Sequence, residues 1–297
     1  MYARVFDALN YRKLLNWVPD QLFLRAAFRA RFGRKLDLNN PKTFNEKLPW
    51  MKLYNRKPEY TLRVDKYKVR NYIAEKLGEE YLIPLLGVWD DPDEIDFDAL
   101  PNQFVLKCNH NSGLGMCICK DKSKLDIQSV KEELRKGLAQ DYYLTGREWP
   151  YKNVPRKIIC EKYMTDETEG DLKDYKIHNF DGEPKVVEVD FDRFKSHKRN
   201  LYSAEWEYIE SAITYPNDST HQIKRPQQLE EMFECARKLS QGLPYVRTDF
   251  YLIDNQIYFG EITFFHDGGW SKFSSEKFEK DFSSWIKLPG GGVPAKF

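Results

Sequence analysis

The sequence lacks net charge, long apolar runs and a regular set of cysteines. Its 297 residues include 47 basic and 46 acidic ones, so the chain has no general attraction for nucleic acid or other polyanions. No apolar run approaches the ~20 residues of a membrane-spanning helix. The first twenty residues also lack the uninterrupted apolar core of a signal peptide. These absences predict a protein that works in the cytoplasm.

The few cysteines follow no spacing typical of a disulfide framework or a zinc site. Five cysteines, an odd number, lie mostly in apolar, strand-like runs, which predicts reduced thiols in a core. Cys117 and Cys119 could form half of a metal site, but alternate residues of a strand simply share one face. Because no second cysteine or histidine pair completes a ligand set, we expect no metal there.

Apolar and aromatic residues are plentiful, at 41% and 15% of the chain, which predicts a globular protein. Two hairpins are indicated, one turning at Asp181-Gly182 and one at residues 254–256. Helical patterns lie between the strands without regular βαβ alternation, so we expect an α+β fold with antiparallel sheets. The predicted organisation is a helical segment (1–60), a first lobe (61–165), a second lobe (166–288) and a flexible tail (289–297).

The first forty residues differ from the rest, because eight Lys/Arg and three Asp give them a net charge of +5. The stretch "LFLRAAFRARFGRK" mixes apolar and basic residues with helical character. Such a helix can lie on an anionic membrane, or it can dock on the protein's own surface with arginine stems covering apolar area. We favour the second interpretation because Pro19 and Gly33 keep the helix short.

The hairpin near the C-terminus carries an unusual pair of carboxylates. A three-residue loop would place Ile253 opposite Ile257, and counting outward then sets Asp249 opposite Glu261. Two carboxylates directly across a sheet repel each other, and a divalent cation such as Mg²⁺ between them would remove that cost. The alternative is a solvated strand face on which Arg247 compensates the acids. The bulky apolar residues around the pair favour a cleft.

The stretch "FVLKCNHNSGLGMCICKD" reads as two strands joined by a polar glycine turn. It is neither a P-loop nor a Rossmann turn, because both of those open a helix. A flexible hairpin turn can still cradle phosphates with its backbone N–H groups, and Lys107 in the preceding strand would add a compact positive charge. The alternative is an edge-strand lysine that reaches into solvent.

The chain resembles the ATP-grasp superfamily over most of residues 60–270. The resemblance lies in the order of its motifs: Lys66, Lys107 with its glycine turn, "EKYM", Lys176 and the carboxylate hairpin. The resemblance implies two α+β lobes that hold ATP between antiparallel sheets, preceded here by a short helical segment. It also implies a set of nucleotide-binding residues: Lys66, Lys107, Ser112, Gly113, Gly115, Glu161, Lys162, Met164 and Lys176.

The same resemblance assigns roles to the hairpin. Asp249 and Glu261 would hold Mg²⁺, and a third ligand, usually asparagine in the family, falls at Thr263. Lys107 and Arg247 would be the catalytic cations that offset charge during transfer. Arg247 is similar in position to the arginine with which D-alanine–D-alanine ligases stabilise an acyl phosphate.

Within the superfamily, the sequence most resembles the TupA-like branch. The similar stretches include "TFNEKLPWMKLYNRKPEYTLRVDKY", "YLIPLLGVWD", "VRTDFYL" and "YFGEITFF". This resemblance implies a cytoplasmic role in bacterial cell-surface polysaccharide assembly, such as capsule formation. The expected reaction is ATP-dependent formation of an amide on a uronic acid or related carboxylate, with a saccharide carboxylate and an amine as substrates. We expect no nucleic-acid partner. A contact with the membrane or with assembly proteins through the basic N-terminal helix stays open.

Polar residues in loops are further candidates for contacts with the substrate. These are His110, Arg193, His197, His266 and Trp270, the last of which could stack on a sugar ring.

Two other activities stay open at this point. Asp190 and Asp192 form an Asp-Phe-Asp pattern that can hold a metal and a sugar nucleotide in a glycosyltransferase. The same ATP site could also serve a phosphotransferase, or a nucleotide-binding protein without turnover.

Overall fold

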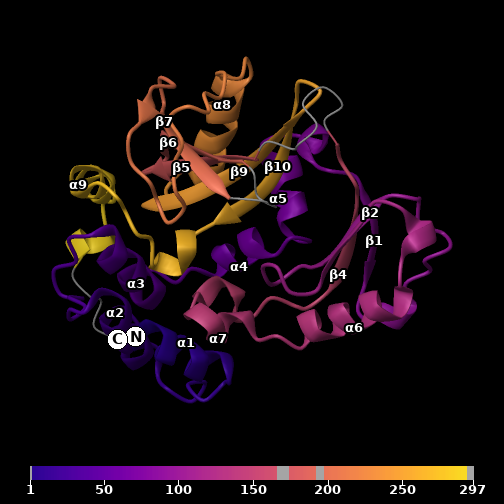
Figure 1. Ribbon diagram of the computed structural model, residues 1–297, viewed down its shortest axis with the longest axis horizontal. Helices are drawn as coiled ribbons and strands as arrows, with labels where there is room; N and C mark the ends of the chain where they lie inside the picture. The colour runs from indigo at the N-terminus through magenta and orange to yellow at the C-terminus, as the bar shows by residue number, and fades with distance from the viewer. Residues whose placement is uncertain (1, 166–173, 192–196, 293–297) are drawn as a thin grey trace.

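Two antiparallel sheets form the frame of the molecule (Figure 1). The computed structural model describes residues 2–165, 174–191 and 197–292. The small sheet has the order β1-β4-β2-β3, and the large sheet has the order β10-β9-β5-β6-β7-β8. The small sheet consists of β1 (Leu85–Trp89), β2 (Phe104–Cys108), β3 (Met116–Cys119) and β4 (Ile158–Lys162). The large sheet consists of β5 (Asp174–Phe180), β6 (Glu183–Phe191), β7 (Lys198–Ser203), β8 (Tyr208–Ile209), β9 (Tyr245–Ile253) and β10 (Gln256–Thr263).

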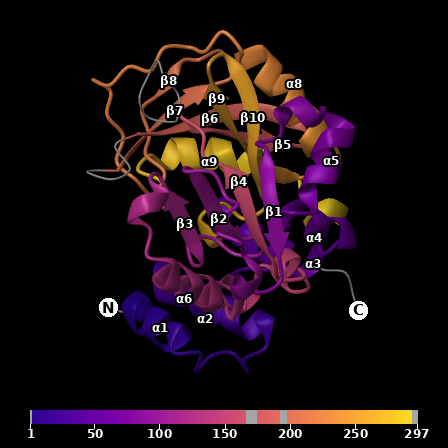
Figure 2. The ribbon, with the colours of Figure 1, turned by 90° about the vertical axis from the view of Figure 1, so that its right-hand side faces the viewer.

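Helices surround the two sheets and confirm the α+β class (Figures 1 and 2). The N-terminal helices α1 (Tyr2–Tyr11), α2 (Asp20–Phe32) and α3 (Phe44–Tyr54) form the base of the molecule. Helix α4 (Pro58–Val64) and helix α5 (Val69–Lys76) lead from this base to the space between the sheets. Helices α6 (Ile127–Leu138) and α7 (Tyr142–Gly146) belong to the small-sheet side, and α8 (Leu229–Ser240) and α9 (Glu276–Ser284) to the large-sheet side.

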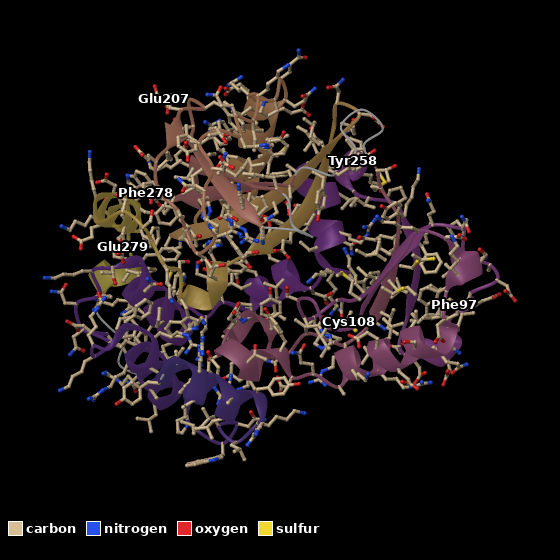
Figure 3. The ribbon with its side chains drawn as sticks, viewed as in Figure 1. Phe97, Cys108, Glu207, Tyr258, Phe278 and Glu279 are labelled. Carbon is tan, nitrogen blue, oxygen red and sulfur yellow. The ribbon has the colours of Figure 1, made fainter. Side chains whose placement is uncertain are left out.

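Two apolar cores hold these layers together. The larger core joins α2, α3 and α8 to the large sheet. The smaller core lies in the small sheet and α6 and includes Phe97, which is labelled in Figure 3. All five cysteines are free thiols, and four of them are buried. No described helix has the length and apolarity that crossing a bilayer requires.

The β9–β10 hairpin corrects the predicted loop but keeps the predicted pairing of the carboxylates. The turn has two residues, Asp254 and Asn255, both with positive φ (50° and 65°). Ile253 therefore pairs with Gln256, and not with Ile257. A bulge at Gly260 then shifts the register by one residue, so that Asp249 pairs with Glu261 as predicted. Two-residue turns with positive φ match the twist of paired strands, and glycine inside a strand often marks a bulge.

The two helices of the N-terminal segment differ in burial. Helix α2 docks on the protein, because Phe23, Leu24, Ala27 and Phe28 are buried, as the favoured interpretation predicts. Helix α1 buries no residue in full. At the other end of the chain, residues 289–292 form a short helical turn, and the remainder of the predicted tail lies outside the described residues.

Candidate active site

A cleft of about 520 Å³ opens between the two sheets. Four residues predicted from the sequence line it: Lys66, Lys107, Glu161 and Glu261. Apolar side chains and further cations that the sequence did not single out complete the wall, among them Arg63, Arg70, Leu82, Ile83, Tyr251, Phe259 and Ile262.

The two lysines of the cleft are held by the backbone and by one glutamate. Lys107 Nζ lies 2.6 Å from Glu161 Oε2, and Arg70 Nη1 lies 3.4 Å from the other oxygen of the same carboxylate. Lys66 Nζ donates to Asn111 O at 2.7 Å, which ties it to the start of the glycine turn. Burial lowers the pKa of Lys66, and the nearby Glu261 carboxylate opposes part of that shift. An anionic ligand beside Lys66 would favour the charged form of this amine.

The glycine turn between β2 and β3 packs on helix α6. The side chain of Asn111 donates to Gly137 O at 3.2 Å, and Gly115 N donates to Glu133 Oε1 at 3.1 Å. Ser112 and Gly113 at the tip are exposed. The base of the loop is therefore anchored while its tip is accessible to a ligand.

Arg247 organises the carboxylates of the hairpin. Its guanidinium group makes a bidentate contact with Asp249, in which the Nε–Oδ1 and Nη2–Oδ2 distances are both 2.7 Å. Nη2 also lies 2.9 Å from Glu261 Oε1 and 3.2 Å from Thr263 Oγ1. Thr263 in turn donates to Glu261 Oε1 at 3.0 Å. One cation thus bridges three oxygen-bearing side chains on neighbouring strands.

The two carboxylates have opposite pKa shifts. Burial raises the pKa of Asp249 to about 7, against the influence of Arg247 and Lys176. Burial also acts on Glu261, but Arg247, Lys66 and Thr263 outweigh it and lower the pKa of Glu261 to about 2. The Glu261 side chain is 38% exposed toward the cleft. Glu261 therefore offers a carboxylate anion at the cleft, and Asp249 lies beside it in its paired contact with Arg247.

This set of oxygen atoms fits Mg²⁺. Mg²⁺ prefers one or two carboxylates together with phosphate oxygens. Asp249 and Glu261 supply two carboxylates, both of which contact Arg247. Thr263 places a hydroxyl oxygen beside them. The wall of the cleft fits a nucleotide as well, because it joins two lysines to a group of apolar and aromatic side chains.

The remaining residues predicted to bind nucleotide lie elsewhere. Lys162 is exposed and Met164 is half-buried after β4, and neither is among the described residues that line the cleft. Lys176 is buried on β5, where it pairs with Asp174 and lies 3.2 Å from Asp190. Its neighbour across the strands is Asp249, so Lys176 belongs to the charged face next to the proposed metal ligands.

The predicted substrate contacts are not brought together. His110 is buried and its Nε2 donates to Gln140 O at 3.1 Å. Trp270 is half-buried, and its ring lies under Arg31 and Lys52. His197 lies 3.1 Å from Asp190, and Arg193 is outside the described residues.

Asp190 is held in ion pairs. Arg199 Nε lies 2.7 Å from its Oδ1, and Lys176 lies 3.2 Å from its Oδ2. Asp192 is outside the described residues. The sheet that carries Asp190 is antiparallel, and its carboxylate already has strong cationic partners.

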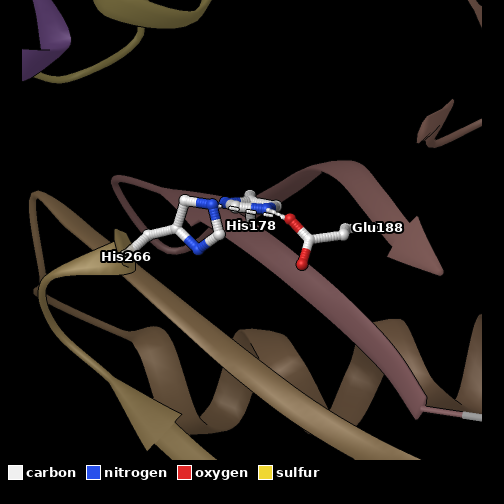
Figure 4. A group of neighbouring side chains, drawn as sticks. All are labelled: His178, Glu188 and His266. Carbon is white, nitrogen blue, oxygen red and sulfur yellow. Dashed lines mark hydrogen bonds and ion pairs between the residues drawn. The ribbon is translucent and has the colours of Figure 1, made fainter. Parts of the chain in front are cut away.

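His266, a predicted substrate contact, is instead fully buried, and sequence reasoning missed the cluster that it forms with His178 and Glu188 (Figure 4). Glu188 Oε2 lies 3.3 Å from His178 Nε2 and 3.5 Å from His266 Nε2. Glu188 and His178 fall on the polar positions of the alternating strands "VVEVDF" and "YKIHNF", a pattern that is equally typical of a solvated strand face, so the sequence carried no distinct signal for the cluster.

The other ring nitrogen of His266 argues against a metal in this cluster. His266 Nδ1 lies 2.8 Å from Arg247 Nη1, and a guanidinium group can only donate. His266 Nδ1 must therefore accept, which places the proton on Nε2. A metal on Nε2 would require a proton on Nδ1 and an acceptor beside it, and Arg247 is no acceptor. The cluster is a hydrogen-bonded support for Arg247.

Comparison with known proteins places the chain in a family. Residues 46–287 match the model of the family described as TupA-like ATPgrasp. The chain belongs to the TupA-like ATP-grasp family. The match includes both antiparallel sheets and begins within α3, so it leaves out α1 and α2. No curated protein matches the chain.

Solved structures similar to this ATP-grasp chain include several ligases. A D-alanine–D-alanine ligase from Bacillus anthracis complexed with ATP is 16% identical, with 68% of this chain and 53% of that chain covered and a TM-score of 0.41. The enzyme of that name from Helicobacter pylori is 16% identical over 84% of this chain and 70% of that chain, with a TM-score of 0.42. The ATP-grasp ligase PsnB, complexed with minimal precursor, Mg and ADP, is 11% identical over 86% of this chain and 65% of that chain, with a TM-score of 0.41. The chain thus spans about half the length of the B. anthracis ligase.

Proposed function

We propose that this chain is an ATP-dependent ligase that joins a carboxylate to an amine. The observation that carries the proposal is the direct pairing of Asp249 with Glu261 across β9 and β10, with Arg247 bridging them. Arg247 offsets the repulsion between the two carboxylates, and their oxygen atoms are the type of ligand that Mg²⁺ prefers. Glu261 lines the same cleft as Lys66 and Lys107, and the chain is a member of a family of ATP-grasp proteins.

In this reaction the γ-phosphate of the substrate ATP passes to a carboxylate oxygen, which forms an acyl phosphate and releases ADP. The amine then attacks the acyl carbon, and the C–O bond to phosphate breaks as the amide forms. Mg²⁺, when bound, would neutralise phosphate charge. Lys66 and Lys107 would hold phosphate oxygens, and Arg247 would stabilise charge that develops on the transferring group. The glycine turn would keep water from the acyl phosphate.

The substrate class is part of the proposal. Resemblance to TupA-like proteins supports a saccharide carboxylate, such as a uronic acid, in the assembly of a bacterial cell-surface polysaccharide. The cations Arg63 and Arg70 in the wall of the cleft are compatible with anionic ligands.

The first test is thermal unfolding with and without Mg-ATP. A ligand at a hundred times its dissociation constant stabilises the folded state by about 2.7 kcal/mol. Each kcal/mol raises the midpoint of thermal unfolding by roughly 2–4 °C. Wild type should shift by several degrees, and Asp249→Asn/Glu261→Gln should lose the shift. The comparison uses the shift within each variant, so that a lower starting midpoint does not matter.

Asp190→Asn is the matched control, because Asp190 is also a buried carboxylate paired with an arginine of the same sheet. It should keep the ATP shift. The proposal would be contradicted if the wild-type midpoint did not shift with Mg-ATP but shifted with a sugar nucleotide and Mn²⁺, and if Asp190→Asn lost that second shift. This result would favour a glycosyltransferase.

The second test distinguishes a ligase from a phosphotransferase. Hydroxylamine attacks an acyl phosphate and yields a hydroxamate, whereas a phosphate ester on a hydroxyl group does not react in this way. Incubation with Mg-ATP, hydroxylamine and a panel of uronic acids should give a hydroxamate that depends on Arg247. ATP consumption with a stable sugar phosphate as product would contradict the ligase assignment.

A further inference from the structure

Exposed apolar side chains are concentrated at the N-terminus. Seven of the thirteen large apolar side chains that are exposed in the described residues fall within residues 2–22. Tyr11, Trp17 and Tyr2 are 89%, 82% and 80% exposed. The others are Val5, Leu9, Leu14 and Leu22. We call these seven side chains the N-terminal surface. Single exposed apolar residues are ordinary, whereas this concentration within one segment makes it a candidate interaction site.

The backbone beneath the N-terminal surface is held in place. Arg147 is buried, and its Nη2 donates to Leu15 O at 2.8 Å and to Val18 O at 3.1 Å. Helix α1 is fixed by the edge-to-face contact of Phe6 with Phe23 and by the bond from Asn10 Nδ2 to Thr145 O at 2.8 Å. The inward face of α1 is therefore packed, and the exposed rings are presented by a preformed segment at the base of the molecule (Figure 2).

The N-terminal segment carries an excess of positive charge. Residues 1–40 carry +5, whereas the remaining residues, with 39 basic and 43 acidic ones, carry −4. The two acidic residues of α1 and α2 are paired, Asp7 with Arg31 and Asp20 with Arg56. Exposed cations, by contrast, stand among the apolar side chains: Arg4, Arg12 and Lys13.

We propose that the N-terminal surface docks the protein on an anionic lipid bilayer. Aromatic rings with polar tips suit the interface between head groups and acyl chains, and basic residues are attracted to anionic lipid. An anionic polysaccharide would use the cations and stack on the aromatic rings, but it would leave the aliphatic side chains Val5, Leu9, Leu14 and Leu22 in water. A second copy of the chain would bring two positively charged segments together, which is unfavourable. The membrane is the partner that satisfies both features, and this proposal is independent of the proposed reaction.

The test is co-sedimentation of the full chain with vesicles. We expect binding to vesicles of phosphatidylcholine with phosphatidylglycerol, and little binding to phosphatidylcholine alone. Added salt should weaken binding, because exposed charges are screened over about 8 Å at physiological ionic strength. Leu14→Ser/Trp17→Ser should bind about tenfold or more weakly through lost apolar burial. Arg12→Glu/Lys13→Glu should lose the preference for phosphatidylglycerol.

Leu62→Ser/Leu86→Ser is the matched control, since both leucines are exposed but lie outside the N-terminal surface. It should bind as wild type does. All variants change exposed side chains, so their urea unfolding should be close to that of wild type.

Equal binding to the two kinds of vesicle, or equal loss in the Leu62→Ser/Leu86→Ser control, would overturn the proposal. The proposal would also be overturned if the protein did not bind vesicles and sedimentation velocity showed a dimer that Leu14→Ser/Trp17→Ser converts to monomers. The N-terminal surface would then contact a second copy of the chain.

Discussion

At the scale of single residues, the site is built around the guanidinium group of Arg247. A buried cation is costly unless its donors are matched by acceptors. Arg247 meets this condition with oxygen atoms of Asp249, Glu261 and Thr263 and with the ring nitrogen of His266. Because Arg247 can only donate, it fixes His266 as a neutral ring with its proton on Nε2. Burial, with cations nearby, lowers the pKa of His266 well below its usual value, which agrees with that state.

A pair of isosteric variants tests this role of His266. Asparagine at position 266 keeps an acceptor oxygen near the place of Nδ1, whereas leucine of similar size has none. We expect His266→Leu to be less stable than His266→Asn by about 1–3 kcal/mol, the cost of an unpaired buried donor. Urea unfolding measures the difference without a known substrate. Equal stability of the two variants would show that Arg247 does not depend on this acceptor.

The same residues show what a sequence can predict at this scale. Lys66, Lys107, Glu161 and Glu261 were predicted as nucleotide or metal ligands, and all four line one cleft. Lys107 and Glu261 stand out by local strand patterns, whereas Lys66 and Glu161 were identified through the resemblance to the ATP-grasp superfamily. The partners of Arg247 on the other side, above all His266, come from a loop after β10, and no local pattern relates its side chain to β9.

At the scale of elements, the β9–β10 hairpin shows how a wrong detail can leave a right conclusion. The predicted three-residue turn and the observed two-residue turn differ by one residue, which would place Asp249 and Glu261 out of register. The bulge at Gly260 restores that residue. The separation of charged and apolar faces constrained the pairing near the site, whereas the turn and the bulge depend on backbone twist.

The glycine turn offers a second element whose geometry can be tested. At Gly115 a Cβ atom would lie 2.6 Å from Cys108 Sγ and 2.7 Å from the Cα atom of Gly137 in α6, whereas at Gly113 a Cβ would meet nothing within 4 Å. Both glycines have positive φ, 71° and 84°, so alanine strains the backbone at either position, by about 1 kcal/mol.

We expect Gly115→Ala to be less stable than Gly113→Ala by about 1–3 kcal/mol, because only the former also forces the loop away from α6. The denaturant midpoint of each variant measures this difference, with Gly113→Ala as the control for backbone strain. If the two variants unfold at the same midpoint, the loop is not anchored by this glycine contact.

At the scale of the whole molecule, one buried lysine joins three distant segments. Lys52 in α3 is fully buried, and its Nζ donates to Gly146 O at 2.6 Å and to Gly268 O at 2.7 Å. Gly146 is the last residue of α7, which lies between β3 and β4 of the small sheet in the sequence. Gly268 belongs to the loop after β10. Burial lowers the pKa of Lys52 to about 8, although Glu148 opposes the shift.

This lysine makes the stability of the molecule depend on pH in a defined direction. The unfolded chain keeps the Lys52 proton up to about pH 10.5, its ordinary pKa, whereas the folded protein releases it near pH 8. Between these values the unfolded state binds more protons, so the Lys52 contribution to the free energy of unfolding rises with pH. Below about pH 8 both states hold the proton, and the cost of a buried charge is fully present.

The contribution of Lys52 can be isolated with Lys52→Met, which retains the apolar stem but has no amine to titrate. Urea unfolding of both proteins at pH 7 and pH 9 should show wild type gaining stability relative to Lys52→Met at the higher pH. The exposed Lys35→Met variant should show no such change relative to wild type, because a solvated amine has the same surroundings in both states. A constant difference between wild type and Lys52→Met across this range would mean that the buried amine stays charged. The charged amine would then hold α3, α7 and the loop after β10 together through its two carbonyl acceptors.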